Sequence, residues 1–200
     1  VASLLISSRP AIEAMDASTI YAVPLKMLQE GLDVIVLKKL QINGYAAPEL
    51  TKWRAFLDKL KYPHSKVTIG LIGKYIELQD AYKSIGEALR HGGLRQRTRV
   101  RLKWLESEQV ETDGVSVLKG VDGILVPGGF GDRGFEGKVA TSQFARDHGI
   151  PYFGICYGMQ AAVVDILRHK GGLPGANTTE IDRQCIDPAI ALITEWRTAS

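Results

Sequence analysis

Apolar and polar positions change period along the chain, and from residue 66 onward they are typical of strands and helices that alternate. Short apolar runs bounded by glycine or proline predict buried strands, and the segments between them carry apolar residues at helical spacing. We expect strands at 67–72, 98–104, 123–126, 150–155 and 189–194. We expect helices at 80–91, 115–118, 135–148 and 158–168, the first of them ended by Gly92 and Gly93.

Strands that alternate with helices over short connections predict a parallel sheet with right-handed crossovers. The expected fold class of residues 66–200 is therefore α/β, with a doubly wound, mostly parallel sheet. Residues 1–40 form a separate first block, in which Pro24 opens a helix and 33–37 fits either a helix or a strand. Residues 41–65 resemble a linker with one helix, which either docks two domains or is an ordinary amphipathic helix.

Composition excludes several classes of protein but does not indicate a function. The 200 residues are 45% hydrophobic with a net charge of +3, which is typical of a globular chain and argues for neither disorder nor nucleic-acid binding. No apolar run of 18 residues predicts a membrane span, and no membrane partner is expected. Two cysteines are too few for a disulfide framework, so we expect a reducing, cytoplasmic compartment. Residue 1 is Val, which we interpret as a cut edge rather than a natural start.

Cys156 carries the sharpest chemical signal. It lies in Gly-Ile-Cys-Tyr-Gly, residues 154–158, between an expected strand and an expected helix. Glycine two residues before and after allows the tight turn of a nucleophile elbow, and the helix N-terminus favours a thiolate. The backbone N–H of Tyr157 then faces the place where an oxyanion forms. The alternative is a buried structural cysteine flanked by turn glycines.

A second glycine-rich turn, Pro-Gly-Gly-Phe-Gly at 127–131, follows the expected strand 123–126. Ligands of open α/β sheets bind at the carboxyl ends of the strands, so Gly129 is a candidate second oxyanion donor. An ordinary glycine turn is the alternative. Glu180 is a candidate for binding a substrate ammonium, or else a solvated loop carboxylate.

The remaining polar patterns predict less. Basic residues alternate from 95 to 103 and are expected to line one face of a strand, as an anion-binding surface or, more simply, a solvated edge. Histidines stand at 64, 91, 148 and 169 without the spacing of metal ligands, so no metal site is expected.

These motifs resemble the class I (triad) glutamine amidotransferases, whose fold is flavodoxin-like. A closer resemblance, to the CTP synthase family, extends over about residues 11–197. It is carried by the stretches 16–25, 73–78, 80–84, 125–134, 176–180 and 192–197. By this resemblance, residues 1–40 end a synthetase (amidoligase) domain, 41–65 link the domains, and 66–200 form a glutamine amidotransferase domain.

The resemblance implies a ligase that converts UTP to CTP with ATP, Mg²⁺ and ammonia from glutamine. Cys156 would be the nucleophile, and the Mg²⁺ ligands would lie outside this chain. Glutamine and its oxyanion would be bound by Gly129, Tyr157, Gly158, Met159, Gln160 and Glu180. ATP would contact Met15, Asp16 and Ala17. GTP as an allosteric effector and a homotetramer are implied in the same way.

The sequence departs from the family at two of these positions. Tyr157 replaces the usual Leu, and Met15 stands where a charged residue is commoner. The triad His and Glu are expected downstream, and no histidine follows Glu180, so we expect the isolated chain to be inactive. Two alternatives stay open: a non-catalytic binding or assembly module, and another triad amidotransferase, such as one that serves GMP synthesis.

Overall fold

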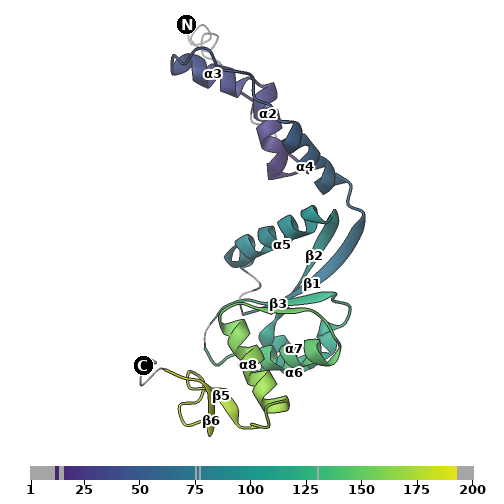
Figure 1. The fold of residues 1–200 in the computed structure, drawn as a ribbon, viewed down its shortest axis with the longest axis vertical. Helices are drawn as coiled ribbons and strands as arrows, with labels where there is room; N and C mark the ends of the chain where they lie inside the picture. The colour runs from purple at the N-terminus through teal and green to yellow at the C-terminus, as the bar shows by residue number, and fades with distance from the viewer. Residues whose placement is uncertain (1–11, 14–15, 75, 77, 130, 193–200) are drawn as a thin grey trace, which may run out of the picture. The chain divides into compact units, whose positions relative to one another are not determined.

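The computed structural model describes residues 12–13, 16–74, 76, 78–129 and 131–192, and it divides the chain into two compact units (Figure 1). The first unit comprises Val1–Tyr62 and the second Pro63–Ser200. The assignment of residues 1–40, 41–65 and 66–200 to separate domains stays a prediction.

The first unit consists of short helices. They are η1 (Ile20–Ala22), α2 (Val23–Gln29), α3 (Leu32–Lys39) and α4 (Thr51–Lys61). Pro24 lies in the first turn of α2, and 33–37 is helical rather than extended. Trp53 of α4 donates its ring N–H to the carbonyl of Tyr21 at 2.8 Å. No described residue of this unit is buried.

The second unit alternates strands and helices, as the sequence predicts. Its strands are β1 (Ser65–Gly73), β2 (Thr98–Glu106), β3 (Gly123–Val126), β4 (Tyr152–Gly154), β5 (Ala176–Thr178) and β6 (Asp187–Ile190). Its helices are η2 (Gln79–Tyr82), α5 (Lys83–Arg95), α6 (Ser107–Asp113), η3 (Val115–Leu118), α7 (Phe135–Asp147) and α8 (Tyr157–His169).

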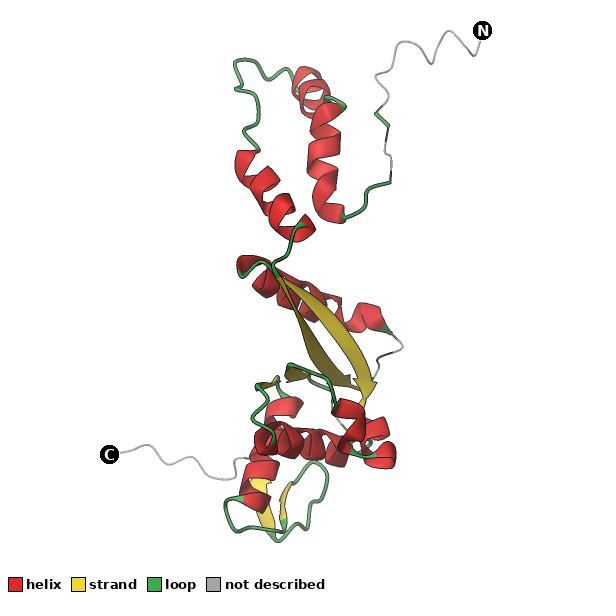
Figure 2. Ribbon diagram, turned by 90° about the vertical axis from the view of Figure 1, so that its right-hand side faces the viewer, coloured by secondary structure: helices red, strands yellow, loops and turns green. Residues whose placement is uncertain are grey.

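The main sheet has the order β2-β1-β3-β4, and every pair in it is parallel. The long strands β1 and β2 lie side by side (Figure 2). The chain winds outward from β1 in both directions, so the carboxyl ends of β1 and β3 form the switch point where such sheets bind ligands. The α/β, doubly wound parallel fold expected from the sequence is confirmed.

Alternate residues of the strands fill two apolar layers. On one face, Leu71 and Leu125 pack with residues of α5 and with Tyr82. On the other face, Ile72 and Ile124 pack with residues of α6, η3 and α7. Helix α8 packs on α7 through a third cluster: Phe135, Val139, Tyr157, Ala161 and Val164.

A buried carboxylate fastens α8 to α7. The side chain of Asp165 is fully buried and accepts hydrogen bonds from Ser142 at 2.9 Å and Arg146 at 3.0 Å. His169, one helical turn away, lies 2.9 Å from the same carboxylate. A buried charge is tolerated only when its oxygens are paired in this way, so α8 is fixed in one orientation against α7.

Several boundaries differ from the sequence prediction. Helix α5 continues through Gly92 and Gly93 to Arg95, and a Cβ at Gly93 would lie 2.6 Å from the carbonyl of Thr98. That glycine therefore permits close packing on β2 rather than ending the helix. Strand β4 is limited to 152–154, and the last strand is 187–190, where 189–194 was expected and 193–194 lie outside the described residues. Segment 115–118 is a 3-10 helix, and the pattern predicted neither α6 nor β5.

Among the described residues, no helix is both long enough and apolar enough to cross a membrane.

Candidate active site

Cys156 lies on a strained turn between β4 and α8. Its φ of +53° and ψ of −108° place a non-glycine residue in a sparsely populated region, and its side chain is exposed. It is the N-cap residue of α8, and its carbonyl accepts hydrogen bonds from Met159 at 3.0 Å and Gln160 at 3.2 Å. The thiol is therefore presented at a helix N-terminus, where the helix dipole stabilises negative charge.

The glycines around this turn are required because neighbouring backbone atoms leave no room for a Cβ. A Cβ at Gly154 would lie 2.5 Å from the carbonyl carbon of Gly158. A Cβ at Gly158 would lie 2.1 Å from the carbonyl oxygen of Val126 in β3. Both distances are far below van der Waals contact, so only glycine allows the strand, the turn and the helix to pack this closely. The elbow expected from the spacing is confirmed as a local backbone geometry.

The glycine loop after β3 borders the elbow. A Cβ at Gly128 would lie 3.5 Å from the Cβ of Cys156. Gly129 has a φ of +138°, a conformation that favours glycine. The structure thus places Gly129 and Tyr157, the two candidate oxyanion donors, on backbone segments on either side of Cys156.

The side chain of Tyr157 lies beneath that loop. It is fully buried, packs on Phe135 with ring centroids 5.1 Å apart, and donates its hydroxyl to the carbonyl of Gly131 at 3.4 Å. Burial raises the pKa of this hydroxyl well above its ordinary value, and the charges of Glu180 and Asp132 raise it further. The phenol therefore stays protonated and serves as a packing and anchoring group, while its backbone N–H begins α8.

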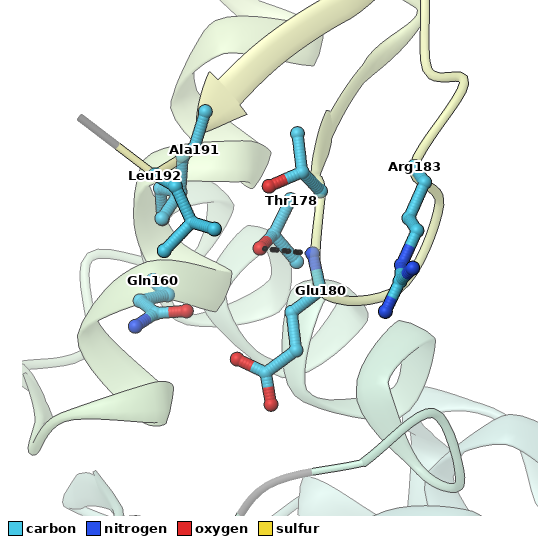
Figure 3. Close-up of a pocket in the computed structure, with 8 residues that line it drawn as sticks. Gln160, Thr178, Glu180, Arg183, Ala191 and Leu192 are labelled. Carbon is cyan, nitrogen blue, oxygen red and sulfur yellow. Dashed lines mark hydrogen bonds between the residues drawn. The ribbon is translucent and has the colours of Figure 1, made fainter. Parts of the chain in front are cut away.

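A cavity of about 720 Å³ opens beside the N-terminal end of α8 (Figure 3). It is lined by Gln160, Thr178, Thr179, Glu180, Arg183, Ile190, Ala191 and Leu192. Glu180 follows β5, and its backbone N–H donates to the hydroxyl of Thr178 at 3.3 Å (Figure 3). The lining combines a carboxylate, a guanidinium and an amide with short apolar side chains, which suits a zwitterionic amino acid.

A buried oxygen of the cavity lining has no hydrogen-bond partner among the residues that the structure describes. Oε1 of Gln160 is buried and has no hydrogen bond within the described part of the chain. An unpaired buried acceptor costs about 1–3 kcal/mol, which a ligand that donates a hydrogen bond would recover. Gln160 is therefore ready to receive a donor from a molecule in the cavity.

The other expected site residues are more scattered. Gly158 is buried against β3, where its glycine identity is explained by packing, and Met159 is 55% exposed on α8. Asp16 and Ala17 belong to the first unit, where the backbone carbonyl of Asp16 accepts from Lys26. Met15 lies outside the described residues.

The basic run is only partly a strand. Arg95 ends α5, and Arg97 occupies the turn with a φ of +51°, so the expectation that the whole run lines one strand face is wrong. The helix extends four residues past its predicted end and takes up the start of the run. Arg99 and Arg101 are exposed on the edge strand β2, and no group of three or more potential metal ligands occurs among the described residues.

Sequence reasoning missed Lys138. This residue of α7 is 1% exposed, and its ammonium donates to the carbonyl of Gly129 at 2.9 Å. Burial, together with a smaller contribution from the charge of Lys74, lowers its pKa to about 8, and negative charge on Cys156 acts in the opposite direction. A signal was present: Lys138 stands three residues after Phe135 and next to Val139, on the face that the helix buries.

Comparison with known proteins finds both a matching family and similar solved structures. The family model of class-I glutamine amidotransferases matches residues 77–180. Among solved structures, the chain is similar to the glutaminase domain of Trypanosoma brucei CTP synthase (CTPS) with bound acivicin, at 35% identity and a TM-score of 0.60. This match covers 64% of the present chain and 50% of that chain, so the present chain spans about half the length of its relative. The range 77–180 includes the glycine loop, Cys156 and Glu180.

Proposed function

Because the chain belongs to the class-I glutamine amidotransferase family, we propose that it is the glutamine-hydrolysing part of a CTP synthase, with Cys156 as the nucleophile. The observation that carries the proposal is the exposed, strained Cys156 at the N-terminus of α8, beside the Gly128–Gly129 loop. The bound acivicin of the similar glutaminase domain is a glutamine analogue, which supports glutamine as the ligand of the cavity.

The cavity suits the amino-acid end of glutamine. Glu180 would pair with the α-ammonium, and Oε1 of Gln160 would accept a hydrogen bond from the same group or from the side-chain amide. The side-chain amide would then extend along α8 toward Cys156, with the exposed Met159 beside it. These roles follow from the charges of the lining residues and from the unused hydrogen-bond acceptor of Gln160.

The chemistry proceeds by attack of the Cys156 sulfur on the side-chain amide carbon. A C–S bond forms, the carbonyl oxygen becomes an oxyanion, and the backbone N–H groups of Gly129 and Tyr157 donate to it. Collapse breaks the C–N bond, ammonia leaves with an added proton, and a glutamyl thioester remains. Water hydrolyses this thioester to glutamate and regenerates the thiol. The resemblance assigns the proton transfers to a His and a Glu that come after Glu180.

The ammonia would serve a second reaction, the ATP-dependent amination of UTP to CTP. In this proposal ATP contacts Asp16 and Ala17, together with Met15, and Mg²⁺ accompanies ATP with ligands outside this chain. GTP regulation, a homotetramer and a cytoplasmic location belong to the same proposal and rest on the resemblance to CTP synthases.

The decisive experiment replaces Cys156 in the enzyme that contains this chain. Cys156→Ala should lower glutamine-dependent CTP formation by at least about 10³-fold, since removal of a nucleophile has effects of this size, and should spare ammonia-dependent formation. Cys185→Ala, at the other free cysteine, is the matched control and should leave both rates unchanged. Acivicin should modify Cys156, as read by peptide mass spectrometry.

Two results would contradict the proposal. If acivicin modified Cys185 in place of Cys156, and if the Cys156→Ala enzyme stayed active, Cys156 would not be the nucleophile. Amination of xanthosine monophosphate but not UTP would keep the glutaminase and assign the chain to another triad amidotransferase.

A further inference from the structure

Lys138 is a buried cation that contacts Gly129 and Tyr157 of the proposed glutaminase site. Its side chain is almost completely removed from solvent, although a lysine ammonium is costly to bury. A substitution by an apolar residue would fit the apolar contacts of α7 with α8 and would avoid this cost. The position of the ammonium therefore needs an explanation beyond packing.

The ammonium joins the two backbone segments that flank Cys156. It donates to the carbonyl of Gly129 at 2.9 Å, and it lies 4.8 Å from the centre of the Tyr157 ring, over its face. The first contact anchors the loop after β3, and the second is a cation–π contact with the first residue of α8. Gly129 and Tyr157 are the residues whose N–H groups would bind the oxyanion.

A second lysine, Lys74, also lies close to the loop. A Cβ at Gly129 would lie 3.9 Å from Nζ of Lys138 and 3.9 Å from Cβ of Lys74, and a Cβ at Gly131 would lie 3.0 Å from Nζ of Lys74. Two lysines thus border the glycine loop, one from α7 and one directly after β1. The positive φ of Gly129 and Gly131 favours glycine at both positions.

We propose that Lys138, in its ammonium form, is a positioning residue of the glutaminase site that holds the Gly129 loop and the start of α8 at the spacing an oxyanion requires. The inference rests on the proposed function and adds a residue to it. The ammonium also favours the negative charge of the oxyanion that would form between these two segments, because opposite charges attract.

The proposal predicts a dependence on pH. The pKa of Lys138 is lowered to about 8 by burial and by Lys74, while negative charge on Cys156 raises it. Tyr157, which also faces the ammonium, stays neutral because its own pKa is raised, and Asp132 and Glu180 act through that hydroxyl. The ammonium form, and with it the anchored loop, is therefore lost as the pH rises through about 8.

The test uses the enzyme that contains this chain and measures glutamine hydrolysis from pH 6.5 to 9.5. Lys138→Met removes the donor and the charge at similar length, and should lower kcat about 10-fold with a smaller change in KM. Lys138→Arg keeps the donor and the charge, and it should recover at least part of the lost kcat. Because arginine stays charged, this variant should keep its activity to higher pH than the wild type does. Lys170→Met, an exposed lysine at the end of α8, is the control and should match the wild type.

Two further readouts separate positioning from misfolding and from failure of the proposed function. Ammonia-dependent CTP formation and the urea midpoint should show that Lys138→Met is folded, while inactivation of Cys156 by acivicin should slow. If Lys138→Met keeps the wild-type kcat and pH profile, the role of Lys138 is wrong and the glutaminase stands. If the wild type neither hydrolyses glutamine nor reacts with acivicin, the proposed function itself is wrong.

Discussion

The two units of the chain use their apolar residues differently. In residues 63–200, side chains such as Leu71, Val126 and Tyr157 are fully buried between a parallel sheet and its helices. In residues 1–62, no described side chain is buried, and Ile20 and Leu40 are 69% and 64% exposed. The helices described in the first unit have at most 11 residues, and helices of this length are marginal in water without tertiary contacts.

This difference shows which unit can hold a residue in a strained backbone conformation. A positive φ at Cys156 costs about 1–3 kcal/mol and persists only if surrounding packing enforces it. The second unit provides such packing directly under the turn, through Gly158 against β3 and Tyr157 against α7. The described residues of the first unit include no buried side chain that could enforce a comparable turn.

The largest effect that tests this contrast is expected from Gly158→Ala. Its new Cβ would overlap the carbonyl of Val126, so we expect a loss of more than about 4 kcal/mol in the free energy of unfolding, or no folded protein. Gly92→Ala is the matched control, because nothing lies within 4 Å of its added Cβ and it sits within α5. This control should gain about 0.5–1 kcal/mol. Urea unfolding measures both, and a Gly158→Ala protein of wild-type stability would refute the close packing.

A pair of phenylalanines compares the two units directly. Phe135→Ala removes a ring that is 1% exposed in the core of the second unit, and should cost about 3–5 kcal/mol. Phe56→Ala removes a half-buried ring that contacts Tyr21 and Trp53 in the first unit, and should cost about 1–2 kcal/mol there. Hydrogen exchange resolved by segment assigns each loss to its unit. Equal losses would show that the first unit has a comparable core.

Sequence pattern predicted the parts of this molecule that depend on local chemistry. The alternation of apolar runs identified the α/β sheet, and the spacing of Gly154, Cys156 and Gly158 identified the elbow, because few other residues fit such a turn. The pattern failed where long-range packing decides. Gly93 looked like a helix end, whereas it permits α5 to approach β2, and the short strand β5 has no apolar run of its own.

For the candidate site, too, the sequence indicated the residues in local motifs but not those placed by long-range packing. Cys156, Gly129 and Glu180 carry recognisable motifs, and the structure brings the first two together with Tyr157. Lys138 was missed because a lysine in a helix is ordinarily solvated; its place beside Phe135 and Val139 indicated the buried face, and the packing of α7 against the glycine loop shows that its ammonium is buried. Arg183 was missed for a similar reason, since the turn after β5 decides that it lines the cavity.

The smallest expected effect concerns the cost of that buried ammonium. The pKa of Lys138 is about 8 in the folded protein and 10.5 in the unfolded chain, so the unfolded chain binds the proton more strongly. The wild type therefore carries the full penalty below pH 8 and is relieved of it as the pH rises toward 10.5. Lys138→Met should be more stable than the wild type by about 1–3 kcal/mol at pH 7.

That advantage should shrink steadily between pH 8 and 10.5, as measured by urea unfolding at each pH, while Lys170→Met should show no such trend. An advantage that did not depend on pH would mean that the gain comes from apolar packing and not from the lost charge. A variant that is more stable and yet slower in glutamine hydrolysis would show that the core of the second unit gives up stability to keep a cation beside Cys156. The first unit, with no buried residue in its described part, has no comparable stability to give up.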